Sequence, residues 1–205
     1  GRDTSGPYRG RDTSGPYGER WQLVMEGQEI ERYFQDLGDE LERRAFKNPI
    51  RIMVVGGVFM LLMVKNRKAT EDVDIVLLDY PDTTNTTPET AAFKAAVNAV
   101  ASMHHLKRKW MNDDVAYFIM DMAPHPQPEL WREFKKLHVY VPVKEYILAL
   151  KLMVFRQKDV NDVESLLREL QVTTREQAQA IVDRFVPDKR WQEHYILDDT
   201  LDELF

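Results

Sequence analysis

The amino-acid sequence predicts an α+β fold in which a small mixed sheet is flanked by helices and followed by a helical C-terminal half. Two observations predict this class. Before residue 142, short apolar runs rich in β-branched residues alternate with longer segments whose apolar residues recur at helical spacing. After residue 142, the apolar residues recur at helical spacing alone. We therefore expect an α/β core at 20–141 and a helical subdomain at 142–205 that packs on it.

The N-terminal residues contain a duplication, since GRDTSGPY occurs at 1–8 and again at 10–17. Two copies rich in Gly, Ser and Pro cannot bury an apolar face, and repeat proteins need at least three units. We expect residues 1–19 to be a tail, disordered or artificial in origin, that takes no part in the fold.

The elements that follow are predicted from their apolar patterns. The predicted strands are short and rich in β-branched residues, and they span 50–55, 72–78 and 139–141. The predicted helices carry apolar residues at helical spacing, and they span 21–46, 58–64, 88–106, 131–137, 146–155, 159–170 and 174–185. Residues 116–120 fit a further strand, and 188–205 fit an apolar tail docked on the body.

Local signals support several of these boundaries. Asn48-Pro49 ends the first helix because the residue before a proline is pushed out of the α region. Gly56-Gly57 separates the first strand from the helix after it. Thr87-Pro88 starts a helix with a hydroxyl cap, and Thr174 with Gln177 forms a capping-box pattern.

The composition excludes several classes of protein. The chain has 205 residues, and 43% of them are hydrophobic, which argues against a disordered protein. Its formal net charge of -6 argues against a protein that coats nucleic acid along its whole surface. It has no cysteine, which excludes disulfides and thiolate zinc sites. The longest apolar run, 52–64, is shorter than the about 20 residues of a membrane helix. We expect a cytoplasmic protein without a membrane span.

Gly56-Gly57 and the acidic pair Asp72-x-Asp74 form the constellation that carries chemistry. In a strand, residues i and i+2 point to the same face, so the two carboxylates project together and repel each other. Mg²⁺ would relieve this repulsion, and it leaves coordination positions for phosphate oxygens. Glycine N–H groups at a helix start can approach a phosphate closely. Each feature alone is more often structural, as a turn or a solvated strand end. Together they predict a nucleoside triphosphate site with a metal.

Three blocks of sequence resemble the minimal nucleotidyltransferases of the AbiEii-type toxin group. IMVVGGV at 52–58 and KATEDVD at 68–74 are similar to its signature, Gly-Gly or Gly-Ser followed by Arg-x-Thr-x-Asp-hydrophobic-Asp. WMND at 110–113 resembles a Trp-Leu-Asn-Asp stretch in relatives. EYILALKLM at 145–153, with Arg156 and KDVND at 158–162, is similar to the helical motifs. The resemblance covers roughly residues 25–186 and implies a sheet of the nucleotidyltransferase type.

The resemblance also implies roles for individual residues. The implied catalytic residues are Asp72, Asp74, Lys151, Asp159 and Asp162, with Asp72 and Asp74 as Mg²⁺ ligands. The implied residues of the nucleotide site are Gly56, Gly57, Lys68, Thr70 and Lys158. Two positions depart from the family pattern. Lys68 stands where an arginine is usual, unless Arg67 substitutes for it, and the strand at 139–141 offers no third carboxylate. Asp159 or Asp162 is then the candidate for the general base.

The expected function is Mg²⁺-dependent transfer of a nucleoside monophosphate from an NTP to a hydroxyl group of RNA or of a protein. A tRNA end is one such RNA acceptor. The resemblance suggests a toxin in a toxin-antitoxin or phage-defence system, with a cognate antitoxin as partner. Two other functions stay open. The first is a catalytically silent nucleotide-binding or protein-interaction module of the same fold, and the second is a small partner-binding domain with a structural Asp pair.

Some residues have a structural alternative. Asp159 is equally well explained as the cap of the helix that follows it. Lys151 lies in an apolar helix, where a lysine needs a partner or a function. His104 and His105 are expected to be ordinary surface histidines. Residues 107–110 read Lys-Arg-Lys-Trp, which fits a patch for an RNA acceptor, although a solvated charged turn is favoured.

Overall fold

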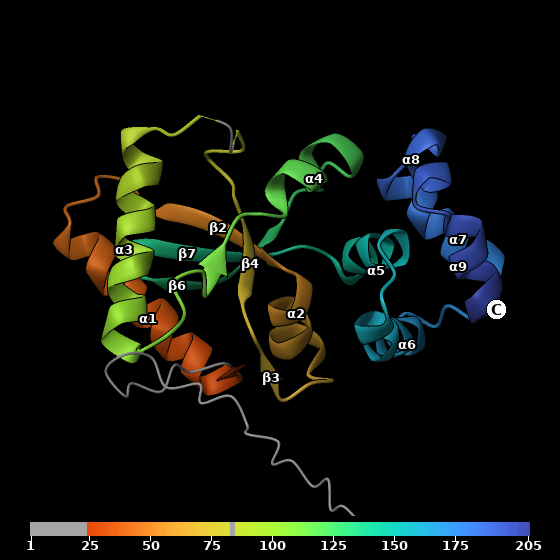
Figure 1. The fold of residues 1–205 in the computed structure, drawn as a ribbon, viewed down its shortest axis with the longest axis horizontal. Coiled ribbons are helices and arrows are strands. Elements are labelled where there is room, and N and C mark those ends of the chain that lie inside the picture. The colour runs from red at the N-terminus through yellow and green to blue at the C-terminus, as the bar shows by residue number, and fades with distance from the viewer. Residues whose placement is uncertain (1–23, 83–84) are drawn as a thin grey trace, which may run out of the picture.

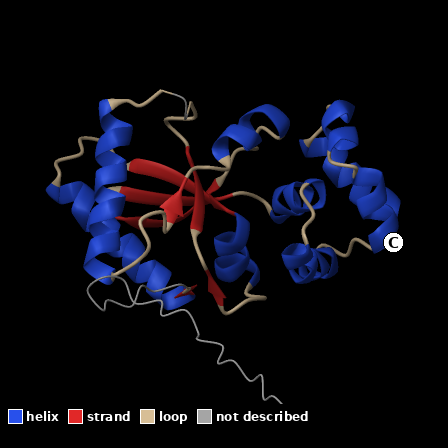
Figure 2. Cartoon of the chain, in the orientation of Figure 1, coloured by secondary structure: helices blue, strands red, loops and turns tan. Residues whose placement is uncertain are grey.

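The computed structural model describes residues 24–82 and 85–205 (Figure 1). The expected tail at 1–19 lies outside these residues. Within them the fold is α+β, as the sequence predicts: a five-stranded mixed sheet and a two-stranded sheet are flanked by helices, with further helices at the C-terminus. Figure 2 shows the strands at the centre of the molecule, between helices on both sides.

The main sheet has the strand order β5-β4-β2-β7-β6. The strands are β2 (Ile50–Val55), β4 (Val73–Leu77), β5 (Met111–Asn112), β6 (Glu129–Phe134) and β7 (Leu137–Val141). β2 is antiparallel to β4 and parallel to β7. β5 is parallel to β4, and β6 is antiparallel to β7. A second, two-stranded sheet pairs β1 (Met25–Glu26) with β3 (Ala69–Thr70).

Two groups of helices lie at opposite ends of the molecule, and short helices lie between them (Figure 1). At one end α1 (Gly27–Arg43) packs on β6, β7 and α3 (Pro88–His104). At the other end α5 packs on α6, α7 and α9. This C-terminal group consists of α5 (Lys144–Met153), the 3-10 helix η2 (Gln157–Asp159), α6 (Val160–Glu169), α7 (Arg175–Phe185), α8 (Lys189–His194) and α9 (Leu197–Leu204). Between the two groups lie α2 (Gly56–Phe59), the π-helix η1 (Met60–Val64) and α4 (Ala116–Met122).

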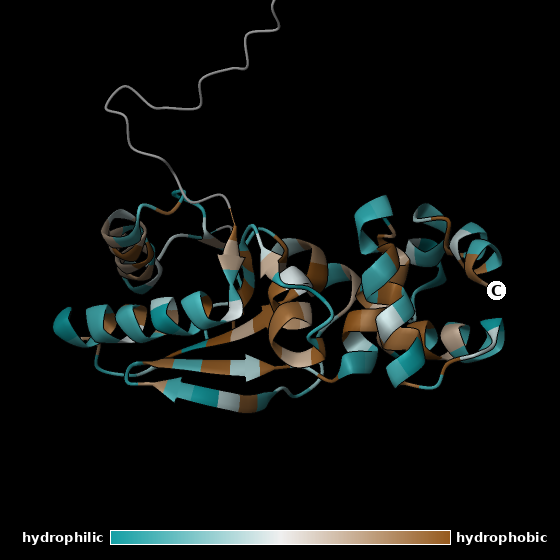
Figure 3. Ribbon diagram, turned by 90° about the horizontal axis from the view of Figure 1, so that it is seen from below, coloured by the Kyte–Doolittle hydropathy of each residue, from teal (hydrophilic) through white to brown (hydrophobic). Residues whose placement is uncertain are grey.

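The buried apolar residues of both groups belong to one hydrophobic cluster. The apolar stripe expected along the first helix is fully buried in α1, where Tyr33, Phe34 and Leu37 have no exposed surface. At the other end, Tyr146 of α5 donates a hydrogen bond from its hydroxyl to the Ala123 carbonyl oxygen, 2.6 Å away. Figure 3 shows apolar residues concentrated at the centre and hydrophilic residues on the outer sides of the helices.

Three expected elements differ in the structure. The helix expected at 131–137 is instead strand β6, because 129–134 pairs with β7 across a tight turn in which Lys135 has a φ of 51°. The strand suggested at 116–120 is helix α4, whose residues at helical spacing, Ala116, Ile119 and Met122, are buried. The tail expected at 188–205 forms α8 and α9.

Two helices predicted by the sequence have different bounds. The first spans Gly27–Arg43 and not 21–46, because Met25–Glu26 pairs with β3 at its start. The helix ends before Asn48-Pro49, at the C-cap Arg44, and Ala45 then has a φ of 59°. The helix expected at 58–64 starts two residues earlier, at Gly56, and its second half, Met60–Val64, is π-helical. No helix in the described part of the chain has both the length and the apolar character that crossing a membrane requires.

Candidate functional site

A cavity of about 730 Å³ lies where the start of α2 and the start of β4 face α4 and α5. Eight of the ten residues that the sequence singles out line this cavity: Gly56, Gly57, Thr70, Asp72, Asp74, Lys151, Lys158 and Asp159. The glycine turn, the acidic pair and the helical motif, which lie up to about 100 residues apart in sequence, therefore meet at one place. Lys68 and Asp162 are not part of the cavity wall.

Both glycines of the turn line the cavity, and neither has room for a side chain. Gly56 has a φ of 64°, in the left-handed region that favours glycine. A Cβ atom on Gly56 would lie 2.7 Å from an Asp74 carboxylate oxygen, Oδ2. A Cβ atom on Gly57 would lie 2.8 Å from both Arg67 Nη1 and Thr70 Oγ1. The turn thus lies directly against an acidic group on one side and a cationic group on the other.

The acidic pair has the alternation that the sequence predicts. Val73 and Ile75 are buried, whereas Asp72 and Asp74 are partly exposed and both line the cavity. Asp74 is opposite Val55 in the β2–β4 register, which places it beside the glycine turn. Burial raises the pKa of Asp74, and the charge of Asp72 raises it further. Lys107 Nζ, 3.9 Å from Asp72 Oδ2, offsets part of this repulsion, and the charges of Lys158 and Arg156 act to lower the pKa of Asp74.

The donor set at this pair fits a hard divalent cation. Among the described residues, no group of three or more His, Cys, Asp or Glu side chains is arranged as a metal site. Mg²⁺ does not require one, since it is commonly held by one or two carboxylates together with water and substrate phosphate oxygens. Asp72 and Asp74 are the residues that would hold it. The geometry that bears on this is that both carboxylates line the cavity, with Asp74 beside Gly56.

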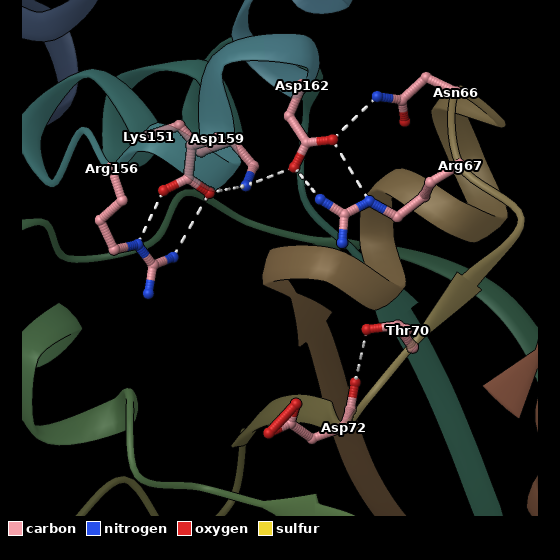
Figure 4. Close-up of polar contacts among 8 residues, drawn as sticks. All are labelled: Asn66, Arg67, Thr70, Asp72, Lys151, Arg156, Asp159 and Asp162. Atoms are coloured by element: carbon pink, nitrogen blue, oxygen red, sulfur yellow. Dashed lines mark hydrogen bonds and ion pairs between the residues drawn. The ribbon is translucent and has the colours of Figure 1, made fainter. Parts of the chain in front are cut away.

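An ion-pair cluster in the helical half contributes Lys151, Arg156 and Asp159 to the cavity wall (Figure 4). Lys151 Nζ donates to Asp159 Oδ1 and to Asp162 Oδ2, at 2.9 Å in each case. Arg156 Nε donates to Asp159 Oδ2 at 2.7 Å. An ammonium group has three donors, so Lys151 keeps one beyond these two ion pairs. The side chain of Lys151 is only 8% exposed, which agrees with the expectation that a lysine in this apolar helix is paired.

Asp159 and Asp162 are ion-pair partners and are poorly suited to act as the general base. Burial acts to raise the pKa of Asp159, but hydrogen bonds from Arg156 and Lys151 outweigh it, so the pKa is lowered. Burial also acts to raise the pKa of Asp162, and hydrogen bonds from Lys151 and Asn66 outweigh it there. A carboxylate with a lowered pKa accepts a proton less readily. Asp159 occupies the N-cap position of α6, as the structural alternative predicts, but its side chain makes no capping hydrogen bond and accepts from Lys151 and Arg156 instead.

Arg67 takes the place that the motif resemblance assigns to Lys68. Lys68 is exposed and outside the cavity, whereas Arg67 lines it. Arg67 donates to Asp162 through Nη2 and, at 3.3 Å, through Nε. Its remaining nitrogen, Nη1, is the one beside Gly57. The only signal in the sequence is that Arg67 adjoins Lys68, because the partner that orients its side chain is 95 residues away.

The segment after Lys109 contributes two residues to the site, Asn112 and Asp114, to which the sequence motifs gave no role. Asn112 of β5 is opposite Asp74, and its amide hydrogen bond acts to lower the pKa of Asp74. Asp114 lines the cavity. Trp110 is fully buried and donates from Nε1 to the Val97 carbonyl oxygen at 3.0 Å. It therefore presents no face to an RNA base, which removes the aromatic part of the patch considered at 107–110.

The two histidines differ from each other. His104 is partly buried, with Nε2 2.6 Å from Asp36 Oδ2 and its ring 4.7 Å from the ring of Tyr33. His105 is exposed and ends α3 in a left-handed conformation. The expectation of an ordinary surface residue is thus wrong for His104. Neither histidine lines the cavity.

A comparison of the chain with protein-family models, with curated proteins and with solved structures finds no match. The resemblance to nucleotidyltransferases therefore depends on the short motifs and on the geometry of the cavity.

Proposed function

We propose that this protein is a cytoplasmic, Mg²⁺-dependent nucleotidyltransferase that transfers a nucleoside monophosphate from an NTP to a hydroxyl group of RNA, with tRNA ends included, or of a protein. One observation carries the proposal. A single cavity is lined by an acidic pair, a glycine turn and the cations Arg67, Lys151 and Lys158, with Asp74 beside Gly56 and Arg67 beside Gly57. This combination suits a triphosphate with its metal, since carboxylates bind the metal and cations bind the phosphates.

In the proposed reaction, the oxygen of the acceptor hydroxyl attacks the α-phosphorus and forms a new P–O bond. The bond between the α-phosphorus and the oxygen that bridges it to the β-phosphorus breaks, and pyrophosphate leaves. The hydroxyl proton passes to a carboxylate of the cavity wall outside the metal pair and the ion-pair cluster, and Glu71 and Asp114 meet this condition. When bound, Mg²⁺ supplies positive charge at the α-phosphate oxygens.

Three cations of the cavity wall hold the departing phosphates. Arg67 Nη1, the third donor of Lys151 and the exposed ammonium group of Lys158 are the groups available for this role. A positively charged group near the β- and γ-phosphates stabilises the charge that develops there as the bond breaks. The carboxylates thus bind the metal, and the cations stabilise the leaving pyrophosphate.

The test is transfer of label from α-labelled nucleoside triphosphates to total RNA or to protein in the presence of Mg²⁺. We expect labelled product and released pyrophosphate with the wild-type protein, and neither with Asp74→Asn. Asp199→Asn, an exposed acid on α9, is the matched control and should retain activity. No labelled product from any nucleotide, together with triphosphate binding that Asp74→Asn leaves unchanged, would falsify the proposal.

A second candidate is the catalytically silent module, and one observation favours it. Both residues considered as the general base, Asp159 and Asp162, are held in ion pairs. This module would bind triphosphate with Mg²⁺ but transfer no label. The toxin role and the cognate antitoxin belong to the first candidate: induced expression should arrest growth with the wild-type protein and not with Asp74→Asn.

A further inference from the structure

The part of the cavity wall contributed by α4, α5 and Tyr195 is largely apolar, and none of its apolar residues has been given a role so far. α4 and its first turn present one row of side chains at helical spacing, and α5 presents another. The residues are Val115, Phe118 and Ile119 from the first row and Ile147, Leu150 and Val154 from the second, with Tyr195 after α8. Rows of this kind usually pack against each other. Here both rows line open space, and Phe118, Leu150 and Val154 remain partly exposed.

Two aromatic rings lie in this apolar wall. The rings of Phe118 and Tyr195 are 5.6 Å apart between centroids and meet edge to face at 86°. Tyr195 is already stacked on Trp191, with ring centroids 6.3 Å apart, and meets His194 edge to face at 4.9 Å. Phe118 has no other ring partner among the described residues, so it is the ring of the pair that offers a face to a further contact. Aliphatic side chains of α5 form the facing wall. The space therefore suits a flat ring with apolar faces.

The apolar and the charged parts of the cavity are joined on one helix. Lys151, which bears the donor left for phosphate, adjoins Leu150 and precedes Val154 by three residues on α5. A ligand that fills the whole cavity must therefore combine a highly charged end with a flat apolar end within one molecule. A nucleotide has this composition, because its triphosphate is polyanionic and every base has π faces.

We propose that Phe118 and Tyr195 form the binding site for the nucleobase, with the base stacked on Phe118, bordered by Tyr195 and enclosed by Leu150 and Val154. This inference rests on the proposed function, since the triphosphate fixes which end of the nucleotide lies at Gly56 and Gly57. The charged residues of the cavity then bind the phosphates. The apolar residues of α4 and α5 supply the affinity that distinguishes a nucleotide from a bare polyphosphate.

The test is isothermal titration of the purified protein with α,β-methylene-ATP and, separately, with inorganic tripolyphosphate, both with Mg²⁺. The wild-type protein should bind the nucleotide analogue at least about tenfold more tightly than tripolyphosphate, since loss of base stacking typically costs that much. Phe118→Ala should weaken binding of the analogue by about tenfold and leave tripolyphosphate affinity unchanged. Tyr117→Ala is the matched control, because Tyr117 is the preceding residue of α4, 65% exposed and outside the cavity wall.

The outcomes separate the two proposals. Equal affinity of the wild-type protein for both probes, or an equal loss for both in Phe118→Ala, overturns the base site and leaves the phosphate site standing. Binding of neither probe overturns the proposed function and the base site with it. If Phe118→Ala does not fold, as judged by circular dichroism and melting temperature, Phe118→Leu and Tyr195→Ala make the same comparison.

Discussion

Replacing Asp162 by asparagine tests whether the ion-pair cluster holds the helical half to the glycine-turn segment. The Asp162 side chain is 2% exposed and accepts from Lys151 at 2.9 Å, from Asn66 at 2.8 Å and from Arg67. Asparagine has nearly the same shape but only one acceptor oxygen, and its amide group would face donors. Lys151 would keep Asp159 as its partner, whereas Arg67 would lose its carboxylate.

The size of the effect follows from this inventory. Removing one partner of a buried ion pair costs about 3–5 kcal/mol. The Arg67 side chain is 27% exposed and can gain water, so a loss near the lower end, about 3 kcal/mol, is expected. For a chain of this size that corresponds to a melting temperature lower by about 6–12 °C. Thermal unfolding at neutral pH followed by circular dichroism measures it.

The matched control is Asp198→Asn on α9. Asp198 accepts from Arg175 at 2.8 Å, but its side chain is 83% exposed, and exposed ion pairs contribute little. We expect its melting temperature to stay close to that of the wild-type protein. Equal melting temperatures for the two variants would refute the reasoning, because they would show that the Asp162 ion pairs are no more important than a surface pair.

The pH dependence gives an independent check. Because the pKa of Asp162 is lowered in the folded protein from its ordinary 3.8, the folded state favours the ionised carboxylate. The contribution to stability is fully present above 3.8 and is lost as the pH falls through the lower pKa of the folded state. The gap between wild type and Asp162→Asn should therefore be constant near neutral pH and shrink below pH 3.8.

Two further predictions concern stability. Asp74→Asn should raise the melting temperature at pH 7, because the raised pKa of Asp74 means that its ionised form is disfavoured in the folded protein. This gain should vanish as the pH falls below 3.8, the ordinary pKa of the group. A lower melting temperature of the variant at pH 7 would contradict the prediction. Gly38→Ala should lower the free energy of unfolding by about 1–3 kcal/mol in urea, because its Cβ atom would lie 1.9 Å from the Phe134 carbonyl oxygen, whereas helix propensity alone predicts a gain.

The parts of the fold that were predictable from sequence are those with strong local signals. The expected strand at 50–55 coincides with β2, which is buried except at Arg51 and is therefore apolar at all of its other positions. The helix after Thr87 begins where its hydroxyl cap and Pro88 indicate, and the helix after Thr174 begins where its capping box indicates, since those signals act within three residues.

The elements predicted wrongly depend on partners distant in sequence. In β6, Trp131 and Phe134 stand three residues apart and imitate helical spacing, but pairing with β7 imposes the strand. The turn between these strands contains Lys135 in a left-handed conformation, without the glycine or asparagine that would mark it. The opposite error at α4 arose because five consecutive apolar or aromatic residues fit both patterns until Met122 shows the helical spacing.

The candidate site divides in the same way. Motif spacing was enough to predict that Asp72 and Asp74 share a face beside Gly56, because strand alternation and the β2–β4 pairing place them there. Whether Arg67 or Lys68 faces the cavity was not predictable, since Asp162 on α6 orients the arginine. The aromatic pair in the cavity wall carried no motif at all, because it joins two helices far apart in sequence.

The charges around the cavity lead to a final prediction about metal removal. Much of the positive charge of the helical wall is already balanced by Asp159 and Asp162, so little is left to offset a triphosphate. Without a cation, the phosphates would also meet the carboxylates of Asp72 and Asp74. We therefore expect titration of α,β-methylene-ATP in excess EDTA to show affinity at least about tenfold lower than with Mg²⁺, and Asp74→Asn to show a much smaller difference between the two conditions. Equal affinity with and without Mg²⁺ in the wild-type protein would mean that the acidic pair does not adjoin the bound phosphates.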